Sequence, residues 1–298
     1  MSDIKLFHLN KNTISELEGK SVALEKSLQS LIEKNLETLL GVTFLASEYN
    51  TGKKHGGRID TLGIDENKCP VIIEYKRSIN ENVINQGLFY LDWLLDHKAE
   101  FALLVMKSQG EKIADSIEWS TPRLLCVAGD FTKYDEHAVM QINRNIELIR
   151  YRRFGNDFLM LELVNATTAQ EVPAVKVPGK YKTVSENFNQ LDNDLKDVFD
   201  ALQSYLMALG DDVQMKTLKY YFAFKRIKNF ACVELHTQAR TILVFVKVSP
   251  DDVTLEEGFT RDVRKIGHFG TGDLEITISN MKNFERAKDI LLKSYEAS

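Results

Sequence analysis

The stretch Gly56–Lys76, GGRIDTLGIDENKCPVIIEYK, decides the fold of the first half of this 298-residue chain. Within it, Arg58–Asp65 and the apolar run Pro70–Lys76 lie on either side of a polar segment that contains Asn67. Apolar runs bounded by turn-forming residues are typical of strands joined by a turn. The stretch therefore predicts a β-hairpin.

The predicted hairpin brings charged side chains together. If the turn centres on Asn67, Asp60 lies across from Glu74, and side-chain alternation puts Glu74 and Lys76 on one face. An unpaired charge beside the apolar residues of this hairpin would be costly. Two carboxylates with a nearby carbonyl suit Mg²⁺ or Mn²⁺ better than zinc. A lysine beside them can orient or deprotonate a water and stabilise a charged phosphate, so the pattern indicates metal-dependent phosphodiester hydrolysis.

The composition is that of a globular protein. Hydrophobic residues make up 44% of the chain, charged residues 27% and aromatic residues 9%, which excludes the disordered, collagen-like and fibrous classes. The longest apolar runs, Phe101–Met106 and Ile242–Val246, are far shorter than the roughly 18 residues of a membrane span, so no membrane partner is expected. The net charge of −5 counts against a nonspecific binder of nucleic acid.

Cysteine usage and the first residues indicate a cytoplasmic location. Cys69, Cys126 and Cys232 are odd in number and far apart, so we expect neither a local zinc or redox motif nor a disulfide framework. Charges at Asp3 and Lys5, with no apolar core around them, argue against a secretory signal. A reducing compartment, the cytoplasm, fits both observations.

The sequence predicts two domains. A segment with two prolines and no apolar periodicity predicts a linker over residues 166–183, between a first domain at residues 1–165 and a second at residues 184–298. In the first domain, apolar patterns predict helices over Ser21–Leu40 and Asn82–Leu95 and from Gly110 and Glu136, and further strands at Phe101–Lys107, Arg123–Ala128 and Phe158–Val164. This order indicates a mixed α/β domain with a partly parallel sheet.

The second domain is predicted to be a small α+β domain. Helices are expected over Ser185–Leu209 and Met281–Tyr295, with strands over Thr241–Ser249 and Leu274–Ser279 between them. The stretch Leu218–Phe230 interleaves aromatic and basic residues, which could contact the bases and phosphates of a nucleic acid. We favour the alternative, that these aromatic side chains fill a core.

Two helices of the first domain carry further candidate site residues. Glu25 falls on the apolar side of the first helix, whereas Glu33 and Glu37 point away from it. A glutamate that faces the hairpin could be a third carboxylate of the metal site, and the alternative is a helix end that reaches solvent. Gln86 and Tyr90, four residues apart, project from one side of the following helix; alternatively they are a surface glutamine and a core tyrosine.

These residues resemble the signature of the PD-(D/E)XK nuclease superfamily. Asp60, thirteen intervening residues and then Glu74-Tyr75-Lys76 at the end of an apolar strand are similar to its motif, with Ile59 in place of the motif proline. Gln86 and Tyr90 resemble the QxxxY element of several such nucleases, which helps to position the lysine and the substrate. The family often has a glutamate on the first helix, as at Glu25. The resemblance implies a restriction-endonuclease-like fold, a mixed sheet flanked by helices, followed here by the α+β domain.

Within the superfamily, residues 25–90 look most like the nuclease domain of archaeal and actinobacterial mismatch-specific endonucleases. Too few residues precede the first helix to form the mismatch-sensing domain of that family, so mismatch specificity is not expected. Glu48 and His55 lie where that family carries polar residues, and we favour a loop position near the site for both. The second domain resembles a small bacterial domain of unknown function, some of whose relatives carry the label "predicted transport protein".

The resemblance implies an endonuclease that depends on Mg²⁺ or Mn²⁺ and hydrolyses DNA in defence or repair, with nucleic acid as its partner. Its metal ligands would be Asp60 and Glu74, its water-orienting or charge-stabilising residue Lys76, and its further carboxylate Glu25. The remaining candidates are three substrate-positioning residues, Arg58, Gln86 and Tyr90, and three cationic residues that could contact nucleic acid, Lys53, Lys54 and Arg77. For two basic clusters of the sequence we favour a solvated face: Lys53, Lys54 and Arg58, and Arg144, Arg150, Arg152 and Arg153. A homodimer is compatible with this family. The alternative is a non-catalytic module, derived from the nuclease fold, that binds nucleic acid or a protein partner.

Overall fold

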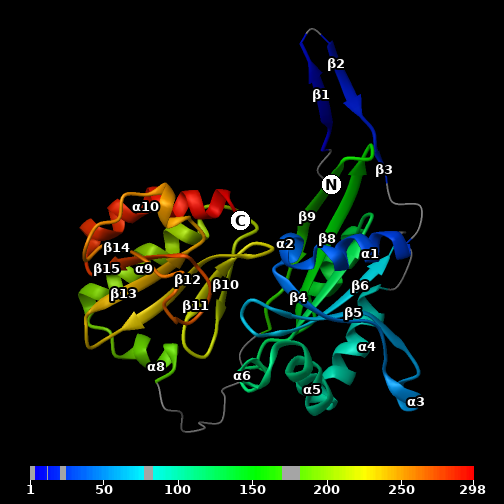
Figure 1. Ribbon diagram of the computed structural model, residues 1–298, viewed down its shortest axis with the longest axis horizontal. Coiled ribbons are helices and arrows are strands. Elements are labelled where there is room, and N and C mark those ends of the chain that lie inside the picture. The colour runs from blue at the N-terminus through cyan, green and yellow to red at the C-terminus, as the bar shows by residue number, and fades with distance from the viewer. Residues whose placement is uncertain (1–3, 12, 21–24, 77–82, 170–181) are drawn as a thin grey trace. The chain divides into compact units, whose positions relative to one another are not determined.

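The computed structural model describes residues 4–11, 13–20, 25–76, 83–169 and 182–298, and the statements below refer to these residues. The chain forms two compact units, residues 1–170 and residues 171–298 (Figure 1). Most of the predicted linker, residues 166–183, lies outside the described residues. None of the described helices is both long enough and apolar enough to cross a membrane.

The first unit is built on a mixed sheet. Its described strands follow the order β3-β8-β7-β6-β5-β4, and β9 pairs with β8. β6, β7 and β8 run parallel to one another, and the other neighbours are antiparallel. The strands are β3 (Gly19–Lys20), β4 (Val42–Asn50), β5 (Arg58–Asp65), β6 (Pro70–Lys76), β7 (Arg123–Ala128), β8 (Asn145–Phe154) and β9 (Phe158–Ala166).

Helices flank this sheet. Thr61 and Tyr75 face α1, while Ile72 packs in a core with residues of α4 and α5. The helices are α1 (Glu25–Lys34), α2 (Leu36–Leu40), α3 (Gly52–His55), α4 (Val83–Asp96), α5 (Lys98–Gln109), α6 (Glu111–Ala114) and α7 (Lys133–Met140). The expected fold class, a mixed sheet flanked by helices, is confirmed for this unit.

Two predictions for the first unit were wrong. The segment Phe101–Lys107 is part of helix α5 and not a strand: Phe101 and Val105, one turn apart, are buried, while Leu103 and Met106 are exposed. The helix predicted over residues 21–40 breaks at Asn35 into α1 and α2, and residues 21–24 are not described.

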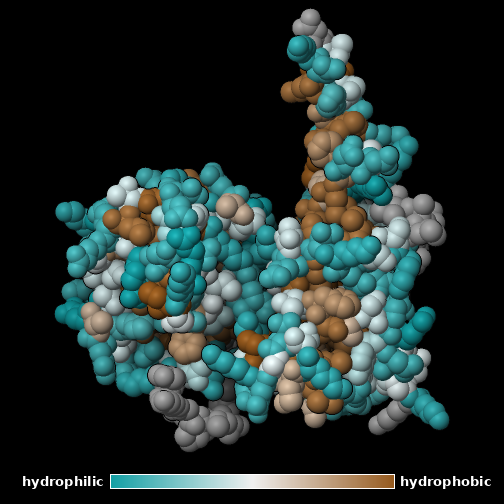
Figure 2. Space-filling view, viewed as in Figure 1, coloured by the Kyte–Doolittle hydropathy of each residue, from teal (hydrophilic) through white to brown (hydrophobic). Residues whose placement is uncertain are grey.

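Strand β8 was not predicted, and its arginines were expected on a solvated face. Arg150 is buried instead, since its guanidinium contacts the carboxylates of Asp130 and Glu162 at 2.7 Å each. A further pair of strands, β1 (Leu6–Asn10) and β2 (Thr13–Leu17), forms a separate hairpin. Leu9 and Ile14 of this hairpin are exposed. Figure 2 shows hydrophobic residues, in brown, on the surface of the hairpin.

The second unit is an antiparallel sheet with helices, as predicted. Its described strands follow the order β10-β11-β12-β13-β15-β14. They are β10 (Gln214–Thr217), β11 (Phe222–Lys225), β12 (Asn229–His236), β13 (Thr241–Val246), β14 (Thr260–Asp262) and β15 (Leu274–Ile278). The long helix predicted over Ser185–Leu209 is divided into α8 (Val184–Asn189) and α9 (Asn193–Met207), because Asp192 caps a new helix; α10 covers Met281–Glu296. A short 3₁₀ helix covers Pro250–Asp252.

The aromatic and basic stretch Leu218–Phe230 belongs mainly to the core of the second unit. Phe222, Phe224 and Phe230 are buried in the cluster between sheet and helices, and Lys225 is buried as well. Arg226 forms an ion pair with Asp212 at 2.7 Å. The favoured interpretation of these aromatic side chains, that they fill a core, is confirmed.

A buried ion triad joins three strands of the first unit. The guanidinium of Arg123, at the start of β7, contacts Asp65 at the end of β5 and Glu147 on β8, each at 2.8 Å. All three side chains are buried. The triad therefore links β7 to its neighbour β8 and to the end of β5, which lies on the far side of β6.

We expect Arg123→Met to lower the free energy of unfolding of the first unit by about 3–5 kcal/mol, because two carboxylates would remain buried without their counter-charge. Tryptophan fluorescence during urea unfolding measures this unit alone, since Trp93 and Trp119 both lie in it. Lys20→Met is the matched control: Lys20 pairs with Glu18 in an exposed ion pair, so stability should barely change. Equal effects of the two substitutions would contradict the role of the triad.

Candidate active site at the β5–β6 hairpin

The hairpin has the register that the sequence predicted. Thr61 pairs with Ile73 and Leu62 with Ile72, which places Asp60 opposite Glu74. The turn is fixed by Asp65, whose carboxylate accepts hydrogen bonds from backbone N–H groups within the turn, those of residues 67 and 69, at 2.9 and 2.8 Å. Asp60 lies five residues before Asp65 on β5, a distance of about 17 Å at roughly 3.4 Å per residue. Hydrogen bonds in the turn thus determine which side chains face each other at the far end of the hairpin.

The carboxylates of Asp60 and Glu74 each accept a hydrogen bond from a backbone N–H group of the opposite strand. Glu74 Oε1 accepts a hydrogen bond from the Asp60 N–H at 3.1 Å, and Asp60 Oδ2 accepts one from the Tyr75 N–H at 3.0 Å. The Asp60 carbonyl oxygen in turn accepts a hydrogen bond from Gln29 of α1 at 2.7 Å. Both carboxylates are therefore held in place by the main chain, and one oxygen of each is left for another partner.

Burial makes this carboxylate pair unusual. Glu74 has no exposed surface, and Oε2 has no hydrogen-bond partner among the described residues. Burial, together with the nearby charge of Asp60, raises the pKa of Glu74 to about 9. Burial also raises the pKa of Asp60. At neutral pH the protein alone therefore keeps Glu74 protonated, and a bound cation would favour its charged form.

Lys76 lies beside the pair and contacts the first helix. Its Nζ is 3.3 Å from Glu25 Oε1, so α1 brings the predicted glutamate to the predicted lysine. Burial lowers the pKa of Lys76, but the carboxylates of Glu25 and Asp60 outweigh it and raise that pKa above its ordinary value. In the free protein Lys76 is thus a charged hydrogen-bond donor, suited to stabilising negative charge rather than to removing a proton.

Gln86 and Tyr90 of α4 reach the start of β5. The Tyr90 hydroxyl accepts a hydrogen bond from the Arg58 N–H at 3.2 Å and another from Gln86 Nε2 at 3.4 Å. A Cβ on Gly57 would lie only 2.7 Å from the Tyr90 ring, so the residue that precedes β5 is held to glycine while Tyr90 keeps its position. Among the described residues, no hydrogen bond connects Gln86 or Tyr90 with Lys76; their contacts position the strand that carries Asp60.

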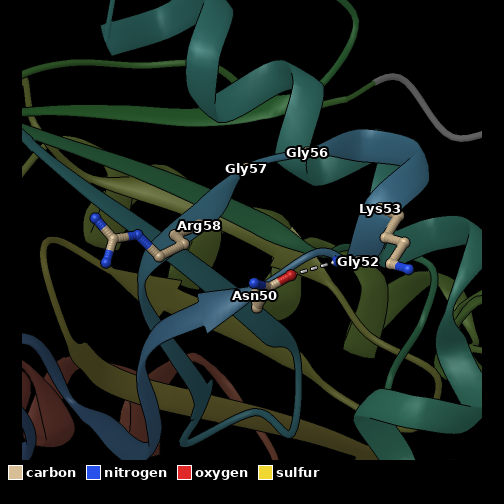
Figure 3. A pocket seen from close by; sticks show the side chains of 6 residues that line it. All are labelled: Asn50, Gly52, Lys53, Gly56, Gly57 and Arg58. Carbon is tan, nitrogen blue, oxygen red and sulfur yellow. Dashed lines mark hydrogen bonds between the residues drawn. The ribbon is translucent and has the colours of Figure 1, made fainter.

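Two of the cationic candidates, Arg58 and Lys53, line one hollow. Arg58 NH1 is 3.5 Å from Glu48 Oε2, and Lys53 lines an open hollow with Asn50 and Gly52 (Figure 3). The side chain of Lys54 and the whole of Arg77 lie outside the described residues.

Sequence reasoning missed one polar residue of this region and misplaced two. Gln29, buried on the apolar face of α1, could have been found as a polar residue between Leu28 and Ile32. Glu33 was expected to point away from the hairpin, but it accepts a hydrogen bond from the Thr61 hydroxyl at 2.7 Å. Glu48 lies on strand β4 and not in a loop.

His55, the other loop candidate, ends the short helix α3. Its ring packs 5.3 Å from the ring of Phe89 and 5.7 Å from that of His97, measured between centroids. His55 is therefore part of an aromatic cluster.

The residues of the hairpin fit a hard divalent cation. Among the described residues, no cluster of three or more His, Cys, Asp or Glu side chains could hold a metal. Mg²⁺, however, commonly binds through one or two carboxylates and takes its other ligands from water and substrate phosphates. Asp60 and Glu74, with the unpartnered and buried Oε2, supply such a pair.

Comparison with known proteins gives little functional information. Residues 184–298 match the model of a domain of unknown function, DUF5655, in agreement with the resemblance predicted for the second domain. An uncharacterised protein of Haemophilus influenzae is 29% identical over 297 residues, which cover 95% of this chain and 96% of that protein. A chain of the EndoMS–dsDNA2 complex is 16% identical, with a TM-score of 0.25, over 49% of this chain and 64% of that chain. A TM-score this low does not establish a common fold.

We expect Mn²⁺ to raise the melting temperature of the first unit, because a cation that binds the native carboxylate pair alone stabilises the folded state. At a Mn²⁺ concentration of 100 times the dissociation constant, the free energy of unfolding rises by about 2.7 kcal/mol. Glu74→Gln should remove this gain, whereas Glu37→Gln, a change at an exposed glutamate of α2, should keep it. Tryptophan fluorescence during heating measures the effect, and an equal gain in both variants would contradict a cation site at the hairpin.

Proposed function

We propose that this protein is a metal-dependent endonuclease that hydrolyses phosphodiester bonds of DNA. The observation that carries the proposal is the buried Asp60–Glu74 pair, held by main-chain hydrogen bonds, with one unpartnered carboxylate oxygen and the ammonium group of Lys76 on its border. A purely structural carboxylate pair would be expected to have its buried oxygens satisfied. Groups with strongly raised pKa values also gather at functional sites.

Each residue of the site has a chemical part in this proposal. Asp60 and Glu74 would hold Mg²⁺ or Mn²⁺, which when bound would lower the pKa of a water and offset the charge of the phosphate. Lys76 donates hydrogen bonds to the phosphate oxygens or to the attacking water and stabilises the charge that develops on the phosphate. Glu25 contacts Lys76, and this contact favours a role for Glu25 in positioning the ammonium group of Lys76 rather than in binding the metal ion.

The surrounding residues place the substrate. Arg58 offers an exposed guanidinium at the start of β5, and Gln86 and Tyr90 hold that strand end in position. Lys53, Lys54 and Arg77 remain candidate contacts to DNA phosphates, which attract cations irrespective of sequence. The cytoplasmic location, the homodimer and the role in defence or repair stay predictions.

The first test is cleavage of supercoiled plasmid and of single-stranded DNA with Mg²⁺, with Mn²⁺ or with EDTA. We expect cleavage that EDTA abolishes, and a loss of about 100-fold or more in Lys76→Ala, since a positioned charged donor of this kind contributes two or more orders of magnitude. Asp60→Asn, which can still accept the hydrogen bond from Tyr75, should lose cleavage while remaining folded. Asp157→Ala and Lys34→Ala, at exposed positions of the same unit, are the matched controls.

The same assay distinguishes the non-catalytic alternative. A folded wild-type protein that binds DNA but cleaves neither substrate with either metal contradicts the endonuclease and favours a binding module. Cleavage that persists in Asp60→Asn contradicts the assigned site.

A further inference from the structure

A third carboxylate extends the row formed by Asp60 and Glu74. On strand β4, Ser47 pairs with Thr61 and Tyr49 with Ile59, so Glu48 lies level with Asp60. Glu48, Asp60 and Glu74 therefore occupy neighbouring positions on three adjacent strands. The backbone of Glu48 is left-handed, with φ of 52°, which is rare for a residue in a strand. Strained conformations of this kind persist where the surrounding structure demands a particular side-chain direction.

The Glu48 carboxylate bridges two cations. Its Oε1 is 2.7 Å from Lys26 Nζ, and its Oε2 is 3.5 Å from Arg58 NH1. The side chains of Lys26 and Arg58 are 61% and 67% exposed, so both charges are open to a ligand from solvent. An oxyanion between a lysine and an arginine is also the arrangement in which these side chains bind a phosphate.

The two cations lie close to the proposed cleavage site. Arg58 is two residues before Asp60 on β5, so both side chains project from one face, about 7 Å apart along the strand. Lys26 follows Glu25, the partner of Lys76, on α1. The spacing of Arg58 and Asp60 along the strand is thus comparable with one nucleotide step of a DNA strand.

Arg58 also lines an open hollow with other residues of the same region. This hollow of about 330 Å³ is lined by Asn50, Gly52, Lys53, Gly56, Gly57 and Arg58, and Figure 3 shows Arg58 and Lys53 projecting to opposite sides of it. Among the described residues that line this hollow, none carries a carboxylate.

We propose that Lys26 and Arg58 bind the phosphate next to the scissile phosphate of a DNA strand, and that this phosphate displaces Glu48 from between them. The inference rests on the proposed nuclease function and narrows its substrate. The enzyme requires a polynucleotide with a charged phosphate on one particular side of the cleaved bond. Glu48 holds the two cations in place until the strand arrives.

The test uses oligonucleotides in which one phosphate is replaced by a neutral methylphosphonate. Cleavage products of wild-type protein with Mn²⁺ are mapped at every bond. The replacement should suppress cleavage by about tenfold at the neighbouring bond on one side only, besides blocking the replaced bond itself. In Arg58→Ala and Lys26→Ala, overall cleavage is weaker and this suppression at the neighbouring bond disappears. Lys34→Ala, which removes a charge at the far end of α1, should keep it.

A second variant tests the displacement of Glu48. Glu48→Gln should lower KM about twofold or more without lowering kcat, because the phosphate no longer competes with a carboxylate for the two cations. A higher KM in this variant would contradict the displacement.

The outcomes separate the inference from the function on which it rests. If wild-type protein cleaves DNA but suppression at the neighbouring bond is absent, or is unchanged in Arg58→Ala and Lys26→Ala, the phosphate site is overturned and the nuclease stands. If wild-type protein cleaves none of the oligonucleotides, the proposed function is overturned and the phosphate site with it.

Discussion

The carboxylate of Asp65 is the constraint on which the rest of the first unit depends. One of its oxygens accepts the N–H groups that close the β5–β6 turn, and the other contacts the guanidinium of Arg123 on the adjacent parallel strand. A one-residue slip of the hairpin would turn every side chain of β6 to the opposite face. Asp60 and Glu74 meet because one buried residue fixes both the register within the hairpin and its attachment to the sheet.

The same burial that fixes the hairpin gives the candidate site its chemistry. Glu74 is fully buried beside a second carboxylate, and this combination is unfavourable for two negative charges. Main-chain N–H groups donate hydrogen bonds to one carboxylate oxygen of Asp60 and one of Glu74. The other oxygen of each residue can contact a ligand. Lys76 adds a positive charge whose own pKa is held high by Glu25 and Asp60. The site thus combines a preference for a cation with a fixed ammonium group, an arrangement suited to handling a phosphate.

Sequence reasoning succeeded where local chemistry determines structure. The strands Arg58–Asp65 and Pro70–Lys76 and their register follow from a short polar turn between apolar runs, and Asp60 and Glu74 follow from that register. The reasoning failed where residues distant in sequence determine whether a side chain is buried. The arginines of β8 looked solvent-exposed because Asp130 and Glu162, which neutralise Arg150, are distant in sequence. The apolar run from Phe101 to Met106 matched a strand in composition, although only one side of it is buried.

For the site, the residues of the β5–β6 hairpin could be predicted from the sequence. The positions of residues on α1 and β4 could not. Glu33 was excluded because it lies off the apolar centre of α1, yet a glutamate side chain is long enough to reach the Thr61 hydroxyl from the helix flank. Glu48 was taken for a loop residue because β4, a strand with a bulge and alternating exposure, gives a weak signal.

The contact between Gly57 and Tyr90 has a consequence for how this protein can change over evolutionary time. The tyrosine ring occupies the space that any side chain at position 57 would need, and its hydroxyl binds the next residue of the strand. Gly57 cannot gain a side chain while the tyrosine ring keeps this position. We expect the two positions to vary as a pair among relatives of this chain, with a side chain at 57 accompanied by a smaller residue at 90.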